Sequence, residues 1–261
     1  MSGSTAIIKK EWRAYFYSPA AYIVIGLFLG IMGIIFTKFV DIYQRYNMAQ
    51  RMGQAQSITL DKLAMYLYQN MHFFLCFMTP FITMRLFAEE KRNSTLELLF
   101  TAPIRGSQLV FGKFFAAYSL MLLMGALSFV YVVFMIMWGN PELPIIATTY
   151  LGLGLTLSCY VALGALISAM TASPAIAAIF TFVLLMLLWL MQSLAQGITA
   201  KWETPFGTLE WGTFLTYLSP LGHFNTFTEG LLHVKDVTYF LSFTVFILFL
   251  THRVVESNRW R

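Results

Sequence analysis

The sequence predicts an all-α membrane protein with six transmembrane helices, and three observations support this fold class. Hydrophobic residues make up 58% of the 261 residues and charged residues only 11%, whereas a soluble domain carries roughly 25% charged residues. Apolar windows of about 19 residues recur six times along the chain. These windows lack the alternating pattern of a membrane barrel, so their backbones must form helices to satisfy their hydrogen bonds in lipid.

The six apolar segments and their loops use the whole length of the chain, which predicts a single transmembrane domain over residues 1–261. No room remains for a nucleotide-binding domain, so an ATP-dependent role would need a separate polypeptide. The expected spans are residues 20–40, 63–84, 114–138, 145–170, 175–196 and 237–254.

Residues 6–20 precede the first span and predict an amphipathic elbow helix on the membrane surface. At helical spacing Ile8, Trp12 and Phe16 share one face, and basic residues lie toward another. Ser18 and Pro19 should then turn the chain into the first span. A plain surface anchor would have the same pattern. The candidate elbow residues are Lys9, Lys10, Trp12, Arg13 and Phe16.

Three polar residues, Gln69, Asn70 and His72, lie in the second span, near its outer end. Polar side chains inside a membrane either bond neighbouring helices or line a route for substrate. Both readings stay open. The connection before this span, residues 41–62, is polar enough to continue the first two helices beyond the membrane.

Residues 85–113 form the longest connection on the side of the termini. Ser94 and Glu97 have the spacing of a capping box, which predicts a new short helix, and Pro103 should end it. That helix would expose leucines between charged residues, so either the bilayer or a protein groove must cover it. The neighbouring charges favour a protein partner.

The outer segment, residues 197–236, is too aromatic for a solvated loop and too rich in Gly and Pro for a span. We expect short helices that lie on the outer leaflet or dip into it. An interfacial anchor with no further role is the alternative. Tight turns around residues 139–144 and 171–174 should make the third, fourth and fifth spans antiparallel neighbours.

The net charge of +5 has a simple source, because cytoplasmic loops of membrane proteins collect Lys and Arg. This favours a chain that meets lipid and no nucleic acid. With cytoplasmic termini, 11 of the 17 basic residues lie inside and six lie outside, which predicts this orientation. The six outer residues are Lys38, Arg45, Arg51, Lys62, Lys201 and Lys235.

The order of these parts resembles an ABC-2 type permease, above all in the run FAEEKRNSTLELLFTAPI between the second and third spans. The resemblance implies a coupling helix that docks on a separate ABC ATPase, which would bind ATP and Mg. It also implies a second permease copy, identical or not, and no cofactor on this chain. The family usually has Gly-Thr where Ser94 and Thr95 stand. The residues implied in coupling are Glu89, Glu90, Arg92, Ser94, Thr95, Leu96, Glu97, Leu98, Leu99 and Pro103.

The C-terminal run from Leu218 to Arg261 is similar to the ends of permeases of the gliding-motility-associated and copper-processing nitrous-oxide branch. This resemblance implies export or force transmission at the bacterial inner membrane. In the gliding branch it adds an anchored subunit with a large outer domain. The matching residues are Ser219, Pro220, His223, Phe224, Gly230, Tyr239, Phe240, Glu256, Ser257, Trp260 and Arg261.

Intramembrane proteases and secondary transporters or channels are the alternatives to a non-catalytic permease. An intramembrane protease needs a Ser–His pair, two Asp residues or a zinc signature within its spans. The expected spans carry no acidic residue and no zinc signature, and a pair of Ser158 or Ser168 with His72 is conceivable but has no further support. A secondary transporter or channel needs ionisable groups at the midplane or two similar interrupted halves, which are not visible. His223 and His233 have no partner at metal-ligand spacing, so we expect structural roles for them and no metal site.

Overall fold

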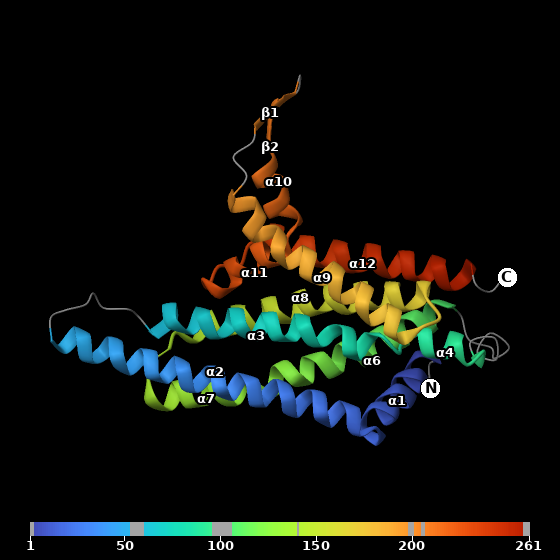
Figure 1. Ribbon diagram of the computed structural model, residues 1–261, viewed down its shortest axis with the longest axis horizontal. Helices are drawn as coiled ribbons and strands as arrows, with labels where there is room; N and C mark the ends of the chain where they lie inside the picture. Colours follow the sequence, from blue (N-terminus) through green and yellow to red (C-terminus); the bar gives the residue numbers. More distant parts are fainter. Residues whose placement is uncertain are drawn as a thin grey trace.

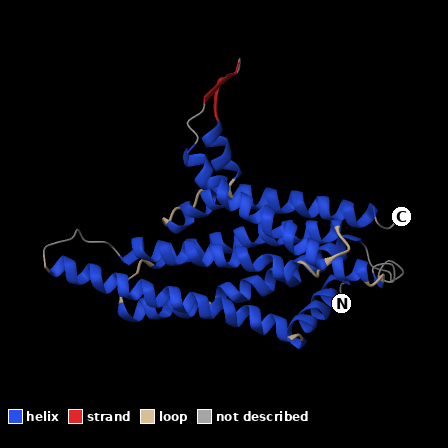
Figure 2. Ribbon diagram, in the orientation of Figure 1, coloured by secondary structure: helices blue, strands red, loops and turns tan. Residues whose placement is uncertain are grey.

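The computed structural model describes residues 3–52, 60–95, 106–139, 141–197, 201–204 and 207–257. Helices dominate these residues, and one small two-stranded sheet stands apart from the bundle (Figures 1 and 2). The elements are α1 (Gly3–Tyr17), α2 (Pro19–Arg51), α3 (Leu60–Thr83), α4 (Ala88–Arg92), α6 (Gly106–Leu127), α7 (Phe129–Trp138), α8 (Leu143–Met170), α9 (Pro174–Gly197), β1 (Lys201–Thr204), β2 (Gly207–Glu210), α10 (Trp211–Leu218), α11 (Pro220–Thr228) and α12 (Val234–Ser257).

Six stretches of the described chain are helical, long and apolar enough to cross a membrane. They follow the six expected segments, so the all-α polytopic fold is confirmed. Both termini lie at the same end of the bundle, together with α1 and α4 (Figure 1). We call this the terminal end. The spans therefore run back and forth between this end and the opposite, distal end.

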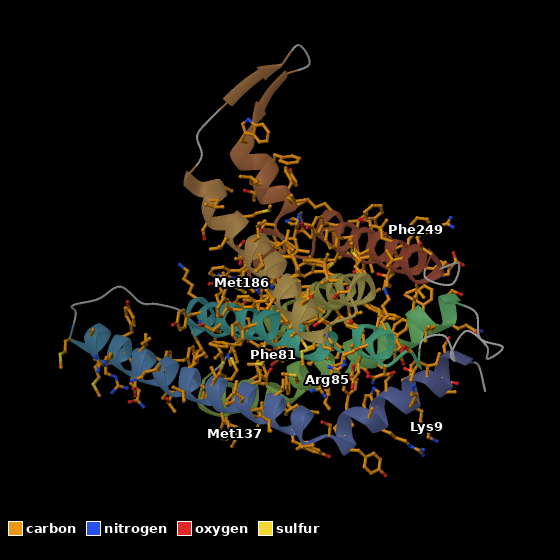
Figure 3. The ribbon with its side chains drawn as sticks, turned by 45° about the vertical axis from the view of Figure 1, so that its right-hand side comes forward. Lys9, Phe81, Arg85, Met137, Met186 and Phe249 are labelled. Carbon is orange, nitrogen blue, oxygen red and sulfur yellow. The ribbon has the colours of Figure 1, made fainter. Side chains whose placement is uncertain are left out.

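The elbow and the first span meet where the sequence predicts. Ser18 is a bend between α1 and α2, and its N–H donates to the carbonyl of Tyr15 at 3.2 Å. Lys9 points from α1 away from the bundle (Figure 3). α2 continues for 33 residues and ends at Arg51, which agrees with a first helix that extends beyond the membrane.

The third span is not one helix, although the sequence predicts a single segment over residues 114–138. It is divided at Ser128 into α6 and α7. The buried Ser128 hydroxyl donates to the carbonyl of Gly125 at 2.6 Å and lies 3.2 Å from the Tyr150 hydroxyl. A hydroxyl that bonds the backbone within its own helix competes with the regular ladder, and this competition coincides with the break at Ser128.

α8 lies in the middle of the bundle and packs against α3, α6, α9, α11 and α12. Small residues allow these close approaches. A Cβ on Gly152 would lie 2.5 Å from the ring of Phe227 on α11, and a Cβ on Gly164 would collide with Thr83 on α3. Both positions therefore require glycine because the neighbouring helix occupies the space of a side chain.

The outer segment corrects one detail of the expectation. Short helices are present as α10 and α11, but β1 and β2 precede them as an antiparallel hairpin with Trp202 opposite Leu209. The hairpin projects from the bundle beyond the end of α9 (Figure 2). The aromatic residues of this stretch predicted interfacial helices throughout, and they are equally suited to strands.

Candidate functional site

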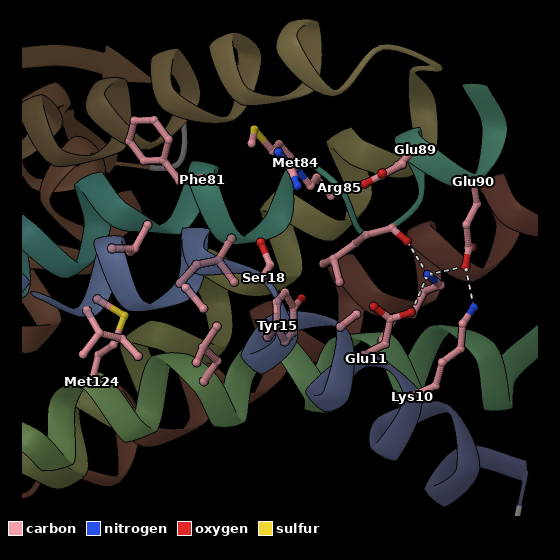
Figure 4. A pocket seen from close by; sticks show the side chains of 18 residues that line it. Lys10, Glu11, Tyr15, Ser18, Phe81, Met84, Arg85, Glu89, Glu90 and Met124 are labelled. Carbon is pink, nitrogen blue, oxygen red and sulfur yellow. Dashed lines mark hydrogen bonds and ion pairs between the residues drawn. The ribbon is translucent and has the colours of Figure 1, made fainter. Parts of the chain in front are cut away.

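A group of charged side chains joins three elements at the terminal end of the bundle, and we call it the terminal cluster (Figure 4). It consists of Lys10 and Glu11 on α1, Glu90 on α4 and Lys113 on α6. The ammonium of Lys113 lies 2.9 Å from Glu90 and 3.1 Å from Glu11. Lys10 lies 3.5 Å from the same Glu90 oxygen. Two cations thus face two carboxylates.

Lys113 is the centre of the terminal cluster, and its side chain is only 2% exposed. Its ammonium also donates to the carbonyl of Leu86 and lies 5.3 Å from the centre of the Phe87 ring. A buried charge is tolerated only where it is paired and its donors are bonded. These contacts fix α6 to the end of the second span and to α1.

α4 is held from a second side by the end of α8. The Ser168 hydroxyl accepts the N–H groups of Phe87 at 3.0 Å and Ala88 at 3.1 Å, and it donates to the carbonyl of Met84. Lys91 donates to the carbonyl of Ala169. The first N–H groups of a helix lack partners in their own helix, so α8 supplies through Ser168 the cap that α4 does not provide.

The elbow helix packs on α6. The indole N–H of Trp12 donates to the hydroxyl of Ser119 at 2.6 Å, and the ring of Phe16 packs at a tilt against Trp12 with ring centres 5.4 Å apart. Lys9 and Arg13 are exposed on the other face. The five candidate elbow residues thus divide between a packed face and a charged face, with Lys10 in the terminal cluster.

Tyr15 adds no charge to this region. Burial, and to a smaller extent the nearby charge of Glu11, raises the pKa of the Tyr15 phenol far above its usual value. The phenol stays neutral over the whole physiological range. The charge of the terminal end is therefore set by its carboxylate, ammonium and guanidinium groups.

The candidate coupling residues fall into three sets. Glu90 belongs to the terminal cluster, whereas Glu89 is half-buried and Arg92 is exposed. Ser94 and Thr95 follow α4, and Thr95 donates its hydroxyl to the carbonyl of Glu90 at 3.3 Å. Five further candidates lie outside the described residues: Leu96, Glu97, Leu98, Leu99 and Pro103.

Ser94 has φ of 54°, in the left-handed region that favours glycine. Its N–H donates to the carbonyl of Lys91 at 3.2 Å, so this residue ends α4 in the way that a glycine after a helix usually does. A residue that caps the start of a helix has extended backbone angles instead. Ser94 therefore closes one helix, and its capping-box partner Glu97 lies outside the described residues.

The polar group of the second span bonds mainly between helices. His72 is fully buried, lies 2.9 Å from the hydroxyl of Tyr160 on α8 and stacks on Phe224 with ring centres 4.5 Å apart. Gln69 donates to Asn225 on α11 at 3.4 Å. Asn70 bonds locally to the carbonyl of Tyr66. Gln69 and His72 therefore bond neighbouring helices, which is the first of the two roles considered for them.

A second buried polar group fastens the outer segment to the last span. His223 on α11 lies 2.6 Å from Asp236 on α12 through Nδ1, and its Nε2 lies 3.0 Å from the carbonyl of Tyr217. Thr226 donates to the other Asp236 oxygen at 2.7 Å. The sequence placed Asp236 in the outer connection, but it is 1% exposed within the first turn of α12.

Sequence reasoning gave no structural role to Glu11, Lys113, Ser168 or Asp236. It counted Lys113 only as a basic loop residue. The available signal for Lys113 was its place beside Phe114, inside an apolar run. Nothing in the sequence distinguishes Ser168 from other small residues of α8. Among the described residues, no group of three or more His, Cys, Asp or Glu side chains could hold a metal ion.

Comparison with protein families finds one match over nearly the whole chain. Residues 5–255 match the family model described as ABC-2 family transporter protein. A comparison with curated proteins finds no match. The matched region includes α1, the terminal cluster, all six spans and the outer segment.

Proposed function

This chain belongs to the ABC-2 transporter family, and from that premise we propose that it is a permease subunit driven by a separate ABC ATPase. In this proposal the ATPase binds ATP and Mg and hydrolyses the nucleotide. The permease has no catalytic residue of its own. It converts movement at the terminal end into movement of the membrane helices, for export or for force transmitted to an outer partner.

The terminal cluster is the observation that carries this proposal. A push by an ATPase can reach the spans only through a stiff connection. α4 is bound to α8 through Ser168 and Lys91, and to α6 and α1 through Glu90 and Lys113. Its displacement would act on several helices at once. Charged pairs with little exposure resist separation, because breaking one leaves a buried charge without a partner.

We assign the docking contacts to the stretch that begins with α4, within residues 85–113. Glu89 and Arg92 would contact the ATPase. Neither residue takes part in the ion pairs of the terminal cluster, so contact with another protein would leave those pairs intact. Glu90 serves inside the molecule, as a transmitter of the movement. The docking helix would follow Ser94 and Thr95 and would contain Leu96, Glu97, Leu98 and Leu99, with Pro103 at its end.

The proposed setting is the bacterial inner membrane with both termini in the cytoplasm, on the basis of the 11 basic residues assigned to the inner side. A second permease copy would complete the transporter. α2 and α9 support this, because both expose large apolar side chains along their length, including Leu27, Ile34, Phe180 and Val183. These faces would meet lipid or the other copy.

The finer proposal is a complex of the gliding-motility type. It rests on the C-terminal resemblance alone, and it adds an anchored subunit with a large outer domain. The neighbouring reading frames test it, because they should encode a P-loop ATPase and such a subunit. Neighbours of an unrelated class would leave the ABC-2 assignment intact and reject the gliding proposal.

The central experiment is purification from native membranes in a mild detergent, followed by measurement of ATP turnover. We expect an ATPase to co-purify, and we expect turnover of the complex to fall when Glu97→Gln or Leu98→Ala is introduced. Arg253→Gln is the control, because Arg253 is exposed on α12, outside the terminal cluster. A chain without a nucleotide-hydrolysing companion, or outer labelling of a cysteine placed at Thr95, would reject the proposal.

A further inference from the structure

A cavity of about 440 Å³ lies at the terminal end, between the elbow and the spans (Figure 4). Its walls come from five helices, α1, α2, α3, α4 and α6, and from the links between α1 and α2 and between α3 and α4. Pockets for small ligands commonly have volumes of roughly 300–1,000 Å³. The cavity is therefore large enough for a ligand of several heavy atoms.

The cavity has an apolar part and a charged part. Val24, Ile25, Phe81 and Met124 line the apolar part. Phe81 is 48% exposed, so this part borders the surface that faces lipid. The charged part holds Arg85, Glu89 and the terminal cluster. A ligand that fits both parts must be an amphiphile.

Three groups in the charged part have no partner among the described residues. The guanidinium of Arg85 and the carboxylate of Glu89 take part in no ion pair, and Glu90 Oε2 is buried without a hydrogen bond. The other oxygen of Glu90, Oε1, forms the ion pairs with Lys10 and Lys113. A buried carboxylate oxygen without a donor costs free energy. One cation and two carboxylate groups therefore remain to bind a ligand.

We propose that this cavity binds a phospholipid with a zwitterionic headgroup and a primary amine, of the phosphatidylethanolamine class. The phosphate would accept hydrogen bonds from Arg85, which can bind it through two N–H groups. The ammonium would donate to Glu89 and to the free oxygen of Glu90. The start of one acyl chain would occupy the apolar part, and the remainder would continue into the bilayer past Phe81.

The charges select this headgroup over the two common alternatives. Lys10, Arg85 and Lys113 face Glu11, Glu89 and Glu90 around the cavity, so the lining as a whole is neutral and suits a neutral headgroup. An anionic lipid would leave Glu89 without a cation and would bring no donor to the free oxygen of Glu90. A choline headgroup carries no N–H to donate, and quaternary ammonium groups are usually recognised by aromatic cages.

Lipid bound here would separate the elbow from the second span and fix the position of Arg85. The site lies within one chain, and it shares Glu89 with the docking contacts proposed for the ATPase. Lipid retention is measured without an ATPase, so its failure is distinguishable from a failure of the permease proposal.

The test uses the full chain reconstituted in vesicles with equal parts of phosphatidylethanolamine, phosphatidylcholine and phosphatidylglycerol. The protein is re-extracted in mild detergent, and the retained lipid is quantified by mass spectrometry. We expect phosphatidylethanolamine to be retained in excess over its share. Arg85→Gln and Glu89→Gln should each lower that excess about tenfold, the effect of losing one charge-assisted hydrogen bond.

Arg13→Gln is the matched control, because Arg13 is an exposed cation of α1 outside the cavity, and it should leave retention unchanged. Val24→Trp fills the apolar part and should abolish retention while all charges remain. Thermal unfolding of each variant verifies that it is folded. Equal retention of the three lipids, preference for phosphatidylglycerol, or retention that survives both Arg85→Gln and Val24→Trp would overturn the proposal.

Discussion

Lys113 and Glu90 form a 2.9 Å ion pair between α6 and α4, and the lysine side chain is almost completely buried. Because Glu11 approaches the same ammonium at 3.1 Å, this one cation pairs with carboxylates from two different helices. Its removal would leave both carboxylates facing each other across a poorly hydrated space. The first prediction follows from this arrangement.

Lys113→Met should destabilise the protein by about 3–5 kcal/mol, the usual result of removing one partner from a buried ion pair. Lys10→Met is the control, because the Lys10 side chain is 63% exposed and surface pairs contribute about 0–1 kcal/mol. The measurement is denaturant unfolding of the detergent-solubilised chain. Equal losses for the two variants would contradict the central role of Lys113.

Ser168→Ala should loosen α4, because the N–H groups of Phe87 and Ala88 lose their acceptor. A buried donor without a partner costs about 1–3 kcal/mol. Hydrogen exchange of these two amides should accelerate more than exchange in α12. Ser242→Ala, an exposed serine on α12, is the control. Unchanged protection at Phe87 and Ala88 would show that Ser168 does not cap α4.

Ser94→Gly should be more stable than Ser94→Val by about 1–2 kcal/mol, because the left-handed conformation at this position penalises a side chain and penalises a β-branched one most. Thermal unfolding of the two variants in the same detergent measures the difference. If valine is tolerated as well as glycine, Ser94 does not hold a positive φ in solution.

Gly164→Ala should destabilise the bundle, because the added methyl group meets Thr83 on α3. Gly26→Ala is the matched control: nothing lies within 4 Å of its added Cβ, so it should be neutral or stabilising. Thr83→Ala combined with Gly164→Ala should restore part of the loss. Thermal unfolding compares the stability of the unmodified chain, the two single glycine variants and the double variant. If the double variant is no more stable than Gly164→Ala, the contact with Thr83 is not the cause of the loss.

Asp236→Ala should release the outer segment from the last span, because it removes the carboxylate that bonds His223 and Thr226. We expect α11 to become more accessible to added protease, while α1 and α6 keep their protection. Glu229→Ala is the control, since Glu229 is exposed beside the same segment. Equal cleavage of both variants would show that the His223–Asp236 pair does not hold α11.

Hydropathy was sufficient to predict the six spans and the elbow, because lipid imposes apolar runs and Ser18 with Pro19 marks the turn. It was insufficient wherever a polar residue is buried by another helix. Lys113 and Asp236 look like loop charges in the sequence, and only the packing of α1 and α11 against them shows otherwise. Ser128 and the strands β1 and β2 show a second limit, since a local hydroxyl bond and strand pairing leave no mark in average hydropathy.

The 33 residues of α2 measure about 50 Å at 1.5 Å per residue, whereas the hydrocarbon core is about 30 Å thick. Even at a steep tilt of about 40°, roughly two turns would remain outside it. Gln44, Arg45 and Asn47 occupy this end, in keeping with contact with water. A protein that binds at the distal end must leave room for this part of α2. The length of the first span therefore limits the shape of such a partner.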